Sequence, residues 1–444
     1  MKIFLDTVGC RLNQAEIEQI ARQFRAAGHE IVGTAAEADL AVVNTCTVTT
    51  EAASDSRAKI RQAARQGVQK IAVTGCWATL EPDAAAALPG VKYVTANARK
   101  ESLAAEILNL DPGAWNLEPL ERVPLPGLHA RTRAFIKVQD GCDNHCTYCI
   151  TAIARGAGRS QQIPDVLTDI RSALAGGTKE IVLTGVHLGS WGQDLSNRHN
   201  AGVELRLQDL VTSILDETDV PRLRLSSLEP WDLDDSFFGL WAGEQRAGRP
   251  RPYVGRLCRH LHLPLQSGSA SVLRRMARKI TPEAFAELVA VARAAIPDVA
   301  ITTDVIAGFP GETEAEFIET LDFVRSMEFA RGHVFTYSAR PGTAAARMDG
   351  QIKPEIRKER NAELRALFAE TEHTYAHKFL GQTLSVLWES SSQLSDAGWQ
   401  MEGLTDNYLR VGAITPQARW NEIDLVRLDA VADDGHLQGE CQPS

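Results

Sequence analysis

Short apolar runs alternate with longer amphipathic stretches over the first 110 residues of the chain. A short run of apolar residues is typical of a buried strand, and apolar residues three or four apart are typical of a helix. The resulting order is strand 2–7, helix 13–27, strand 40–44, helix 53–66 and strand 70–74. Because strands that alternate with helices usually form a parallel sheet, we expect a small α/β domain here.

A similar alternation resumes beyond residues 113–130, a segment rich in proline and glycine that predicts a linker. The later strands are expected at 135–138, 180–184, 222–226, 260–265 and 300–306. Parallel strands with right-handed helical crossovers close into a partial or full βα barrel, and the chemistry of such a barrel lies at the carboxyl ends of its strands. We expect a barrel of this kind in the middle of the chain.

From residue 382 the pattern changes to short alternating runs at 384–388, 408–411 and 424–428, which predict a small β-barrel of the OB-like kind. A chain of 444 residues also exceeds what one hydrophobic core normally supports. We therefore expect an α/β protein with domains at residues 1–112, 131–376 and 377–444, with 113–130 as the linker.

The composition indicates a reducing compartment. No apolar run reaches the length of a membrane span, and the first residues do not sustain the apolar stretch of a secretory signal. In such a chain, eight cysteines are more readily explained as cluster ligands or free thiols than as disulfides. We expect a cytoplasmic protein without a membrane partner.

The net charge of −10 argues at first against a nucleic-acid partner, but the charge is unevenly distributed. Residues 379–444 hold 3 Lys and Arg against 10 Asp and Glu, whereas residues 131–378 hold 31 against 32. Basic residues gather instead at 251–279 and 353–365. These two segments fit either solvated helix faces or a surface that contacts phosphates.

Three cysteines with the spacing CxxxCxxC follow directly after the expected strand at 134–138. We call them the loop cysteines: Cys142, Cys146 and Cys149. Three thiolates on one loop can hold three corners of a 4Fe-4S cube and leave the fourth iron open for a ligand. The alternatives are a structural zinc site, for which no second pair of ligands follows at zinc-finger distance, and three free thiols.

A second set of cysteines lies far apart in the sequence. Each member follows an expected parallel strand, and we call them the sheet cysteines: Cys10, Cys46 and Cys76. Parallel strands bring their carboxyl ends to one edge of a sheet, so three loops there can converge on one site. The alternative is three buried thiols that behave as small hydrophobic side chains.

The loop cysteines, with a preceding strand, Asp140-Gly141 and the aromatic Tyr148, resemble the radical S-adenosylmethionine (SAM) superfamily. The stretches around the sheet cysteines resemble the cysteine motifs of the methylthiotransferase family within it: 7–14, 43–48 and 73–76. Further stretches are most similar to the branch that modifies threonylcarbamoyladenosine in tRNA: 138–142, 181–189, 262–269 and 302–306. The resemblance covers almost the whole chain and implies an auxiliary-cluster domain, a radical-SAM core and a TRAM barrel.

This resemblance implies two 4Fe-4S clusters and SAM as cofactors. The cluster on the loop cysteines would cleave SAM to a 5′-deoxyadenosyl radical, while an auxiliary cluster on the sheet cysteines would carry the sulfur, which another SAM methylates. The hydrogen on carbon-2 of adenine is unactivated, so a radical rather than a side-chain base must remove it. The expected product is the 2-methylthio form of threonylcarbamoyladenosine at position 37 of tRNA, next to the anticodon.

By the same resemblance, Tyr148 would pack beside the adenine of SAM. Residues at the ends of expected strands supply further candidate SAM contacts: Gly185, Ser227, Glu229, Gln266, Ser267 and Asp304. The alternative for each of them is an ordinary turn or capping residue. We expect no catalytic side chain, because the two clusters would carry the chemistry.

The expected partners are the anticodon loop of tRNA, whose unstacked bases a pocket can capture, and an electron donor such as flavodoxin or ferredoxin. No DNA partner is expected. Because the TRAM segment is acidic, the basic segments 251–279 and 353–365 would carry more of the RNA contact. Segment 155–160 is poorer in arginine than is usual in the family, which puts local substrate contacts there in doubt.

Two alternatives to this function remain. The same chemistry could act on isopentenyladenosine in tRNA or on an aspartate of a ribosomal protein. A different class is a non-catalytic iron-sulfur protein that transfers electrons or binds RNA. Two sites with three cysteines each argue against that class, because an electron carrier gains nothing from an open iron.

Overall fold

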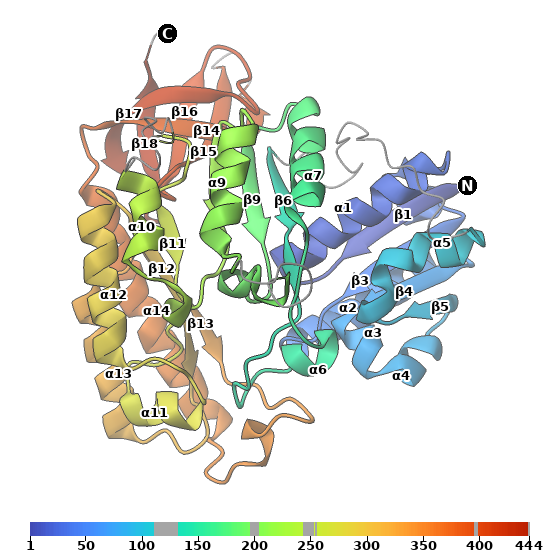
Figure 1. The fold of residues 1–444 in the computed structure, drawn as a ribbon, viewed down its shortest axis with the longest axis horizontal. Helices are drawn as coiled ribbons and strands as arrows, with labels where there is room; N and C mark the ends of the chain where they lie inside the picture. Colours follow the sequence, from blue (N-terminus) through green and yellow to red (C-terminus); the bar gives the residue numbers. More distant parts are fainter. Residues whose placement is uncertain (111–131, 196–203, 243–252, 254, 395–397, 443–444) are drawn as a thin grey trace.

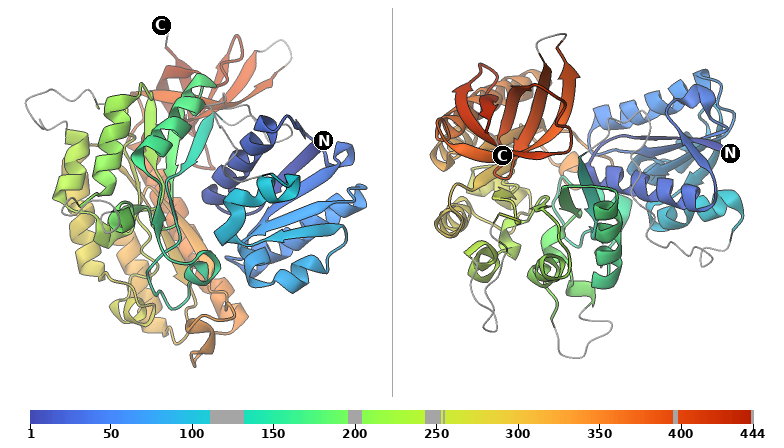
Figure 2. Two further views of the ribbon diagram at one scale, coloured as in Figure 1. Left: turned by 45° about the vertical axis from the view of Figure 1, so that its right-hand side comes forward. Right: turned by 90° about the horizontal axis from the view of Figure 1, so that it is seen from above.

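The computed structural model describes residues 1–110, 132–195, 204–242, 253, 255–394 and 398–442. An amino-terminal sheet domain lies beside a larger central unit, and a small barrel covers one end of that unit (Figures 1 and 2). The linker expected at 113–130 falls outside the described residues. No helix in the described part of the chain is both long and apolar enough to cross a bilayer.

The amino-terminal domain contains a five-stranded sheet in the order β2-β1-β3-β4-β5, and its strand pairs are parallel. Its strands are β1 (Lys2–Thr7), β2 (Glu30–Val32), β3 (Leu40–Thr45), β4 (Ile71–Gly75) and β5 (Val91–Thr95). Its helices are α1 (Arg11–Ala26), α2 (Thr50–Arg65), α3 (Cys76–Leu80), α4 (Pro82–Ala86) and α5 (Leu103–Leu108). The pattern of apolar runs missed β2 and β5, which are the short or half-buried strands at the sheet edges.

Each face of this sheet is covered by helices. The apolar sides of α1 and α5 pack on one face, through residues such as Phe24 and Leu103. Helix α2 and the segment from α3 to α4 cover the other face, where Ile60 and Trp77 are fully buried. The continuous apolar runs of β3 and β4 follow from this arrangement, because both faces of these strands are buried.

The central unit contains two three-stranded parallel sheets, β10-β9-β6 and β11-β12-β13. Their strands are β6 (Arg133–Lys137), β9 (Glu180–Thr184), β10 (Arg222–Leu225), β11 (His260–His262), β12 (Ala300–Ala307) and β13 (Arg331–Thr336). Isolated parallel bridges, Leu223 with Leu257 and Ser227 with His262, join the sheets side by side. Among the described residues, β6 and β13 do not pair, so of the two expected forms the structure has the partial barrel.

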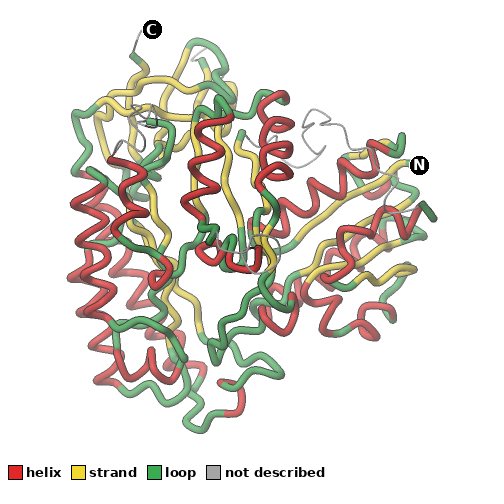
Figure 3. Tube along the Cα trace, viewed as in Figure 1, coloured by secondary structure: helices red, strands yellow, loops and turns green. Residues whose placement is uncertain are grey.

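Helices lie outside the strands of this partial barrel (Figure 3). They are α6 (Thr151–Arg155), α7 (Ile163–Ala175), α9 (Leu207–Glu217), α10 (Asp235–Ala242), α11 (Ala270–Arg275), α12 (Pro282–Ala295), α13 (Glu314–Met327) and α14 (Pro354–His377). One apolar core joins α7, α9, α10, α12, α13 and α14 to the strands. Strand β13 was not expected, because few of its side chains are buried and its apolar pattern is weak. A short hairpin of β7 (Gln139–Asp140) and β8 (Arg159–Ser160) flanks the loop cysteines.

The carboxy-terminal segment forms a closed barrel in the order β14-β15-β16-β18-β17. Its strands are β14 (Thr383–Gln393), β15 (Trp399–Thr405), β16 (Arg410–Thr415), β17 (Ile423–Val431) and β18 (Leu437–Cys441). Trp388 and Met401 are fully buried in its core. Arg222 and Arg224 of β10 donate hydrogen bonds to barrel carbonyl oxygens, including those of Leu404 and Asp406, which fixes the barrel at the amino end of the central strands.

Candidate functional site

The three sheet cysteines line one cavity of about 520 Å³. Cys10 follows β1, Cys46 follows β3 and Cys76 follows β4, so they come from adjacent parallel strands. The opposite wall of the cavity is formed by residues on or just after β9, β10, β11, β12 and β13 of the partial barrel. The cavity therefore lies between the amino-terminal domain and the central unit.

Two glycines let these strands turn sharply into the cavity. Gly9 and Gly75 each precede a sheet cysteine and have φ of 97° and 98°, a region that side chains with a Cβ disfavour. A Cβ at Gly9 would lie 2.6 Å from the Cys46 sulfur, and one at Gly75 would overlap the Thr45 carbonyl oxygen. Close approach of the strand ends therefore requires glycine at both positions.

The sheet cysteines differ in their surroundings. Cys46 is buried, and its backbone N–H donates to the Ser56 hydroxyl at 2.9 Å, while Cys10 is open to the cavity. Burial raises the pKa of the Cys46 thiol to about 11, and exclusion of water also raises the pKa of Cys10. A metal bound at these two thiols would displace their protons, because metal ligation requires the thiolate form.

The donor chemistry of this site fits an iron-sulfur cluster. Among the residues that the structure describes, no group of three His, Cys, Asp or Glu side chains is placed to hold a single metal ion. A 4Fe-4S cube binds each thiolate at a different iron, so its cysteines stand farther apart than the ligands of one ion. The sheet cysteines could hold three corners of such a cube, with the fourth iron facing the cavity.

A buried charge network connects the sheet cysteines with the central unit. The Arg155 guanidinium of α6 donates to Glu16 and Asp140, both at 2.8 Å, and to the Asn13 side-chain oxygen at 2.7 Å. Burial alone would raise the pKa of Glu16, but Lys100, Arg155 and other cations hold it below its usual value. Arg155 therefore joins the amino-terminal domain to the central unit.

The loop cysteines are held by backbone bonds to a distant segment. Gly141, with φ of 72°, begins the turn after β7, and the Cys149 N–H donates to the Cys146 carbonyl. The Thr147 N–H donates to the Met276 carbonyl, and its hydroxyl donates to the carbonyl of Arg275 at 2.9 Å. The loop is thus anchored to the end of α11.

A buried arginine lies beside the loop cysteines. Arg278 forms an ion pair with Glu229 at 2.8 Å, and its guanidinium lies 4.5 Å from the centre of the Trp231 ring. Burial raises the pKa of the Cys146 thiol, and Arg278 partly opposes this increase through charge and a hydrogen bond. The same cation would stabilise an anionic cluster bound at Cys146.

His187 is a further polar neighbour of this loop that the sequence motifs did not identify. Its Nε2 lies 2.6 Å from Asp232, and its Nδ1 lies 3.3 Å from the Asn144 amide. Burial lowers the pKa of His187, but hydrogen bonds to Asp232 and Cys142 outweigh this effect and raise it to about 10. The sequence signal that could have identified His187 was its position in the stretch 181–189, which resembles the family.

Some of the expected SAM contacts line the cavity, and others lie outside it. Gly185, Ser227 and Asp304 line the cavity opposite the sheet cysteines. Glu229 does not line it and is paired with Arg278. Tyr148 lies outside it as well, packed against the apolar cluster that contains Phe309, Tyr337, Val272, Met276, Ile306 and Ala345.

Gln266 and Ser267 form the turn after β11. Gln266 has φ of 76°, and its backbone pairs with β12 through Asp304 and Ile306. The Ser267 hydroxyl is fully buried and lies 3.1 Å from the Thr320 hydroxyl. This placement favours a structural role for Ser267 in holding the turn against α13.

The barrel end of the cavity carries polar residues that the sequence analysis missed. His260, His262 and His333 line it together with Tyr408 of the carboxy-terminal barrel. His260 stacks on Tyr408 with ring centres 4.0 Å apart and planes at 6°. The alternation His260-Leu261-His262 in a strand was the only local signal, and nothing local placed Tyr408 beside it.

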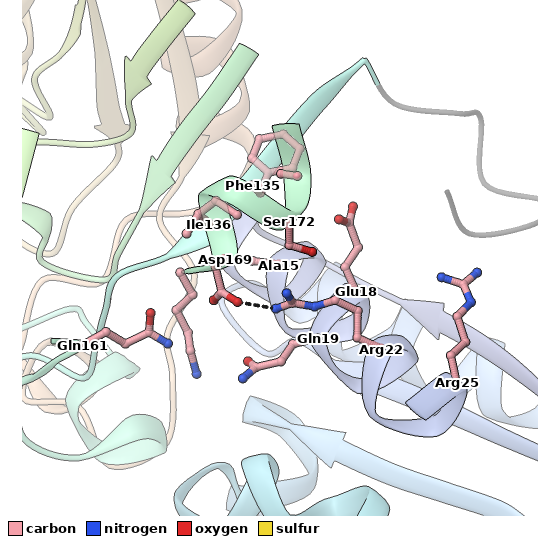
Figure 4. A pocket seen from close by; sticks show the side chains of 12 residues that line it. Ala15, Glu18, Gln19, Arg22, Arg25, Phe135, Ile136, Gln161, Asp169 and Ser172 are labelled. Carbon is pink, nitrogen blue, oxygen red and sulfur yellow. Dashed lines mark hydrogen bonds and ion pairs between the residues drawn. The ribbon is translucent and has the colours of Figure 1, made fainter. Parts of the chain in front are cut away.

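A second hollow, of about 30 Å³, lies where α1 faces β6 and α7 (Figure 4). Arg22 of α1 forms an ion pair with Asp169 of α7 at 2.8 Å across this interface. The hollow has room for about one water molecule. It is therefore a gap in a domain interface rather than a ligand site.

Comparisons with known proteins identify the family. Residues 2–96 match a family described as uncharacterized protein family UPF0004, and residues 249–324 match the radical SAM superfamily. The threonylcarbamoyladenosine tRNA methylthiotransferase MtaB of Bacillus subtilis is 37% identical over 415 residues, which cover 91% of this chain and 88% of the relative. A tRNA-2-methylthio-N(6)-dimethylallyladenosine synthase of Geobacillus thermodenitrificans is 32% identical, with 88% and 75% covered.

The fold resembles that of a solved radical S-adenosylmethionine methyltransferase, TsrM of Kitasatospora setae, with a TM-score of 0.55. That likeness covers 78% of this chain and 76% of the other at 16% identity, and it supports the fold alone. Together with the sequence relatives, it accounts for the central unit and the amino-terminal sheet. The chain belongs to the methylthiotransferase family of radical SAM enzymes, which use a 4Fe-4S cluster and SAM.

Proposed function

We propose that this enzyme replaces the carbon-2 hydrogen of threonylcarbamoyladenosine at position 37 of tRNA with a methylthio group. One observation carries the proposal: the three sheet cysteines line the same cavity as Gly185, Ser227 and Asp304, the candidate SAM contacts. A radical can act only on an atom placed next to it, so radical source, sulfur and substrate must share one space. The loop cysteines lie directly before Ile150 and Thr151, which also line this cavity.

When bound, a cluster on the loop cysteines would supply the electron that cleaves one SAM, and a cluster on the sheet cysteines would hold the sulfur that another SAM methylates. The chain itself fixes the position of the two cysteine sets relative to each other. Arg155 ties the start of α1 to α6, so the two cysteine sets cannot shift independently.

Exposed apolar side chains at the cavity fit a base that has left the anticodon stack. Phe335 and Val48 line the cavity and are 43% and 57% exposed. An aromatic face is the usual support for a flipped base, and the anticodon loop presents unstacked bases. We assign Phe335 as the stacking partner of the target adenosine.

The substrate assignment has independent support. Relatives named for threonylcarbamoyladenosine are 37%, 36% and 31% identical to this chain, and those named for dimethylallyladenosine are 31% to 34% identical. The cavity also has a polar end, formed by His262, His333 and Tyr408, which suits a polar N6 substituent better than a hydrocarbon.

Nucleoside mass spectrometry of tRNA tests the proposal. Cells that lack the gene should lose methylthio-threonylcarbamoyladenosine and regain it with the wild type, but not with the Cys142/Cys146/Cys149→Ala variant. Cys441→Ala is the matched control because Cys441 belongs to neither cysteine set. Loss of methylthio-isopentenyladenosine instead would overturn the substrate. Purified enzyme that forms no 5′-deoxyadenosine from SAM under anaerobic reduction would overturn the reaction itself.

The surface that we propose for tRNA binding contains fewer cations than the two basic segments of the sequence. Within the basic segments, Arg256, Arg259, Arg275 and Arg360 bind carbonyl groups or carboxylates of the protein itself. Among the described residues of these segments, the cations that stay exposed are Arg274, Lys279, Lys353, Lys358 and Arg365, and Arg251 lies outside the described residues. The Gly311–Gly350 backbone bond and the Arg275–Gly311 bond bring the end of α11 close to the start of α14. Arg274, Lys279, Lys353 and Lys358 therefore share one end of the central unit, whereas Arg365 lies in the middle of α14.

The double variant Arg274→Glu/Lys358→Glu tests this surface. We expect weaker tRNA binding and a shallower dependence of affinity on salt, by about 0.7 per lost phosphate contact on a logarithmic scale. Arg427→Glu, on the acidic barrel, should leave both quantities unchanged. Unchanged affinity and salt dependence in the double variant would remove α11 and α14 from the RNA surface.

A further inference from the structure

The cavity has a cation beside the sheet cysteines whose role the chemistry of the clusters does not explain. Arg11 follows Cys10 directly and begins α1, and its side chain lines the cavity. Its Nη2 donates to the Tyr408 hydroxyl of the carboxy-terminal barrel at 2.9 Å. A guanidinium has five N–H donors, so this one bond leaves most of its donors for a ligand.

No described carboxylate forms a direct ion pair with Arg11, although the charges of His262 and Arg11 oppose the effect of burial and lower the pKa of Asp304. The acid that lines the same cavity, Asp304, lies 3.3 Å from His262. Arg155, the other arginine of the cavity wall, is paired with Glu16 and Asp140. A half-buried guanidinium with free donors attracts an anionic group, and guanidinium groups bind carboxylates in a planar two-bond arrangement.

The electrostatic surroundings favour an anion at this end of the cavity. Burial alone would raise the pKa of the Tyr408 hydroxyl, but the guanidinium groups of Arg11, Arg133, Arg224 and Arg331 together hold it below its usual value. The three histidines of the cavity wall add no negative charge. A carboxylate placed beside Arg11 and Tyr408 would therefore meet a positive field.

The proposed substrate carries a carboxylate in a suitable position. Its N6 substituent is a threonine joined through a carbamoyl group, and carbon-2 and N6 both flank N1 on the same edge of the adenine ring. An adenine whose carbon-2 reaches the sheet cysteines must therefore place its N6 substituent near the same loop, which contains Arg11. We infer that the Arg11 guanidinium binds the carboxylate of the N6 substituent and so selects threonylcarbamoyladenosine over adenosines with neutral substituents.

This inference rests on the proposed function and gives Tyr408 a positioning role. Tyr408 holds the Arg11 side chain by its hydroxyl and is itself fixed by its stacking on His260. The acidic barrel would then contribute to substrate selection through Tyr408, although its charge disfavours phosphate contacts.

Binding of two synthetic anticodon stem-loops to the holoenzyme tests the inference. One RNA carries threonylcarbamoyladenosine, and the other carries the same substituent with its carboxylate replaced by a carboxamide. The wild type should bind the carboxylate RNA at least about tenfold more tightly, because a hydrogen bond to a charged group contributes about 1.5–3 kcal/mol. Arg11→Gln should bind both RNAs equally, and Arg11→Lys should keep part of the preference.

Arg61→Gln is the matched control, because Arg61 is an exposed arginine of α2, and it should keep the full preference. Iron and sulfide content shows whether Arg11→Gln keeps its clusters next to Cys10. Tyr408→Phe leaves α1 unchanged and should lower the preference several-fold, so it tests the inference even if Arg11→Gln loses iron.

The outcomes separate the inference from the proposed function. If Arg11→Gln weakens both RNAs equally, Arg11 binds a phosphate or SAM and the inference is wrong. If the wild type forms the methylthio product by mass spectrometry but binds both RNAs alike, the proposed function stands and the inference fails. If it forms product only on an RNA with dimethylallyladenosine, the proposed function fails and the inference fails with it.

Discussion

The loop cysteines stand within residues 142–149, whereas the sheet cysteines are spread between residues 10 and 76. The first set depends on one turn after β7 and on two bonds from Thr147 to the end of α11. The second depends on the register of β1, β3 and β4 and on tight turns at Gly9 and Gly75. One site is therefore local in the chain, and the other exists only when a whole sheet has formed.

The two sets also share a feature. Each lies near a buried arginine, Arg278 for the loop cysteines and Arg155 for the sheet cysteines. Arg278 pairs with a carboxylate of the same unit, whereas Arg155 reaches across to Glu16 of the other domain. The site on the sheet cysteines is therefore more sensitive than the other site to substitutions far from its own cysteines.

The largest effects should come from removing each set of cysteines. Cys142/Cys146/Cys149→Ala should lose about half of the iron and all 5′-deoxyadenosine formation, because the cluster that cleaves SAM has no ligands left. Cys10/Cys46/Cys76→Ala should lose the other half and still form 5′-deoxyadenosine without methylthio product. Iron and sulfide quantitation with product chromatography checks both. If the Cys10/Cys46/Cys76→Ala variant kept its full iron content, the protein would hold only one cluster, on the loop cysteines.

Arg155→Ala should destabilise the domain interface by about 3–5 kcal/mol, because it leaves Glu16 and Asp140 as buried carboxylates with fewer partners. Denaturant unfolding measures this change, and iron content should fall mainly at the sheet cysteines. Arg171→Ala is the control, since Arg171 is an exposed arginine of α7 that pairs with Glu217, outside this network. Equal effects of the two variants would mean that the network does not hold the domains together.

Gly75→Ala should be more harmful than Gly67→Ala, although the two glycines have nearly the same φ, 98° and 97°. No atom lies within 4 Å of a Cβ at Gly67, so that variant carries only the backbone strain, about 1–3 kcal/mol. At Gly75 the Cβ also overlaps the Thr45 carbonyl and pushes β4 away from β3. Thermal unfolding and iron content of the two variants give the comparison, and similar iron content would argue against the close-approach explanation.

The smallest effects are expected from single hydrogen bonds. Ser56→Ala removes the hydroxyl that binds both the N–H and the carbonyl of Cys46, and Thr147→Val removes the bond from the loop to Arg275. Each change should lower the free energy of unfolding by about 1 kcal/mol. Ser56→Ala should make only the auxiliary site lose iron faster to a chelator, and Thr147→Val only the other. If either variant made both clusters lose iron faster to the chelator, the two sites would not be separate.

Most of the fold could be predicted from apolar patterning. The runs at β3, β4 and β9 are nearly continuous because these strands are covered on both faces. Strands β2, β5 and β13 are short or partly exposed, so neighbouring strands rather than their own residues decide that they form. The same reason applies to β15 and β18 of the closed barrel, which are fixed by their partners in the ring.

The sequence by itself determined the chemistry that depends on local spacing: the loop cysteines, the three strand ends with their cysteines, and the order of the domains. Only the tertiary structure decided what surrounds them. Arg11 meets Tyr408 across 397 residues, and Arg155 meets Glu16 across 139. Burial and pairing of such side chains depend on how distant elements pack, and no local pattern of residues records that packing.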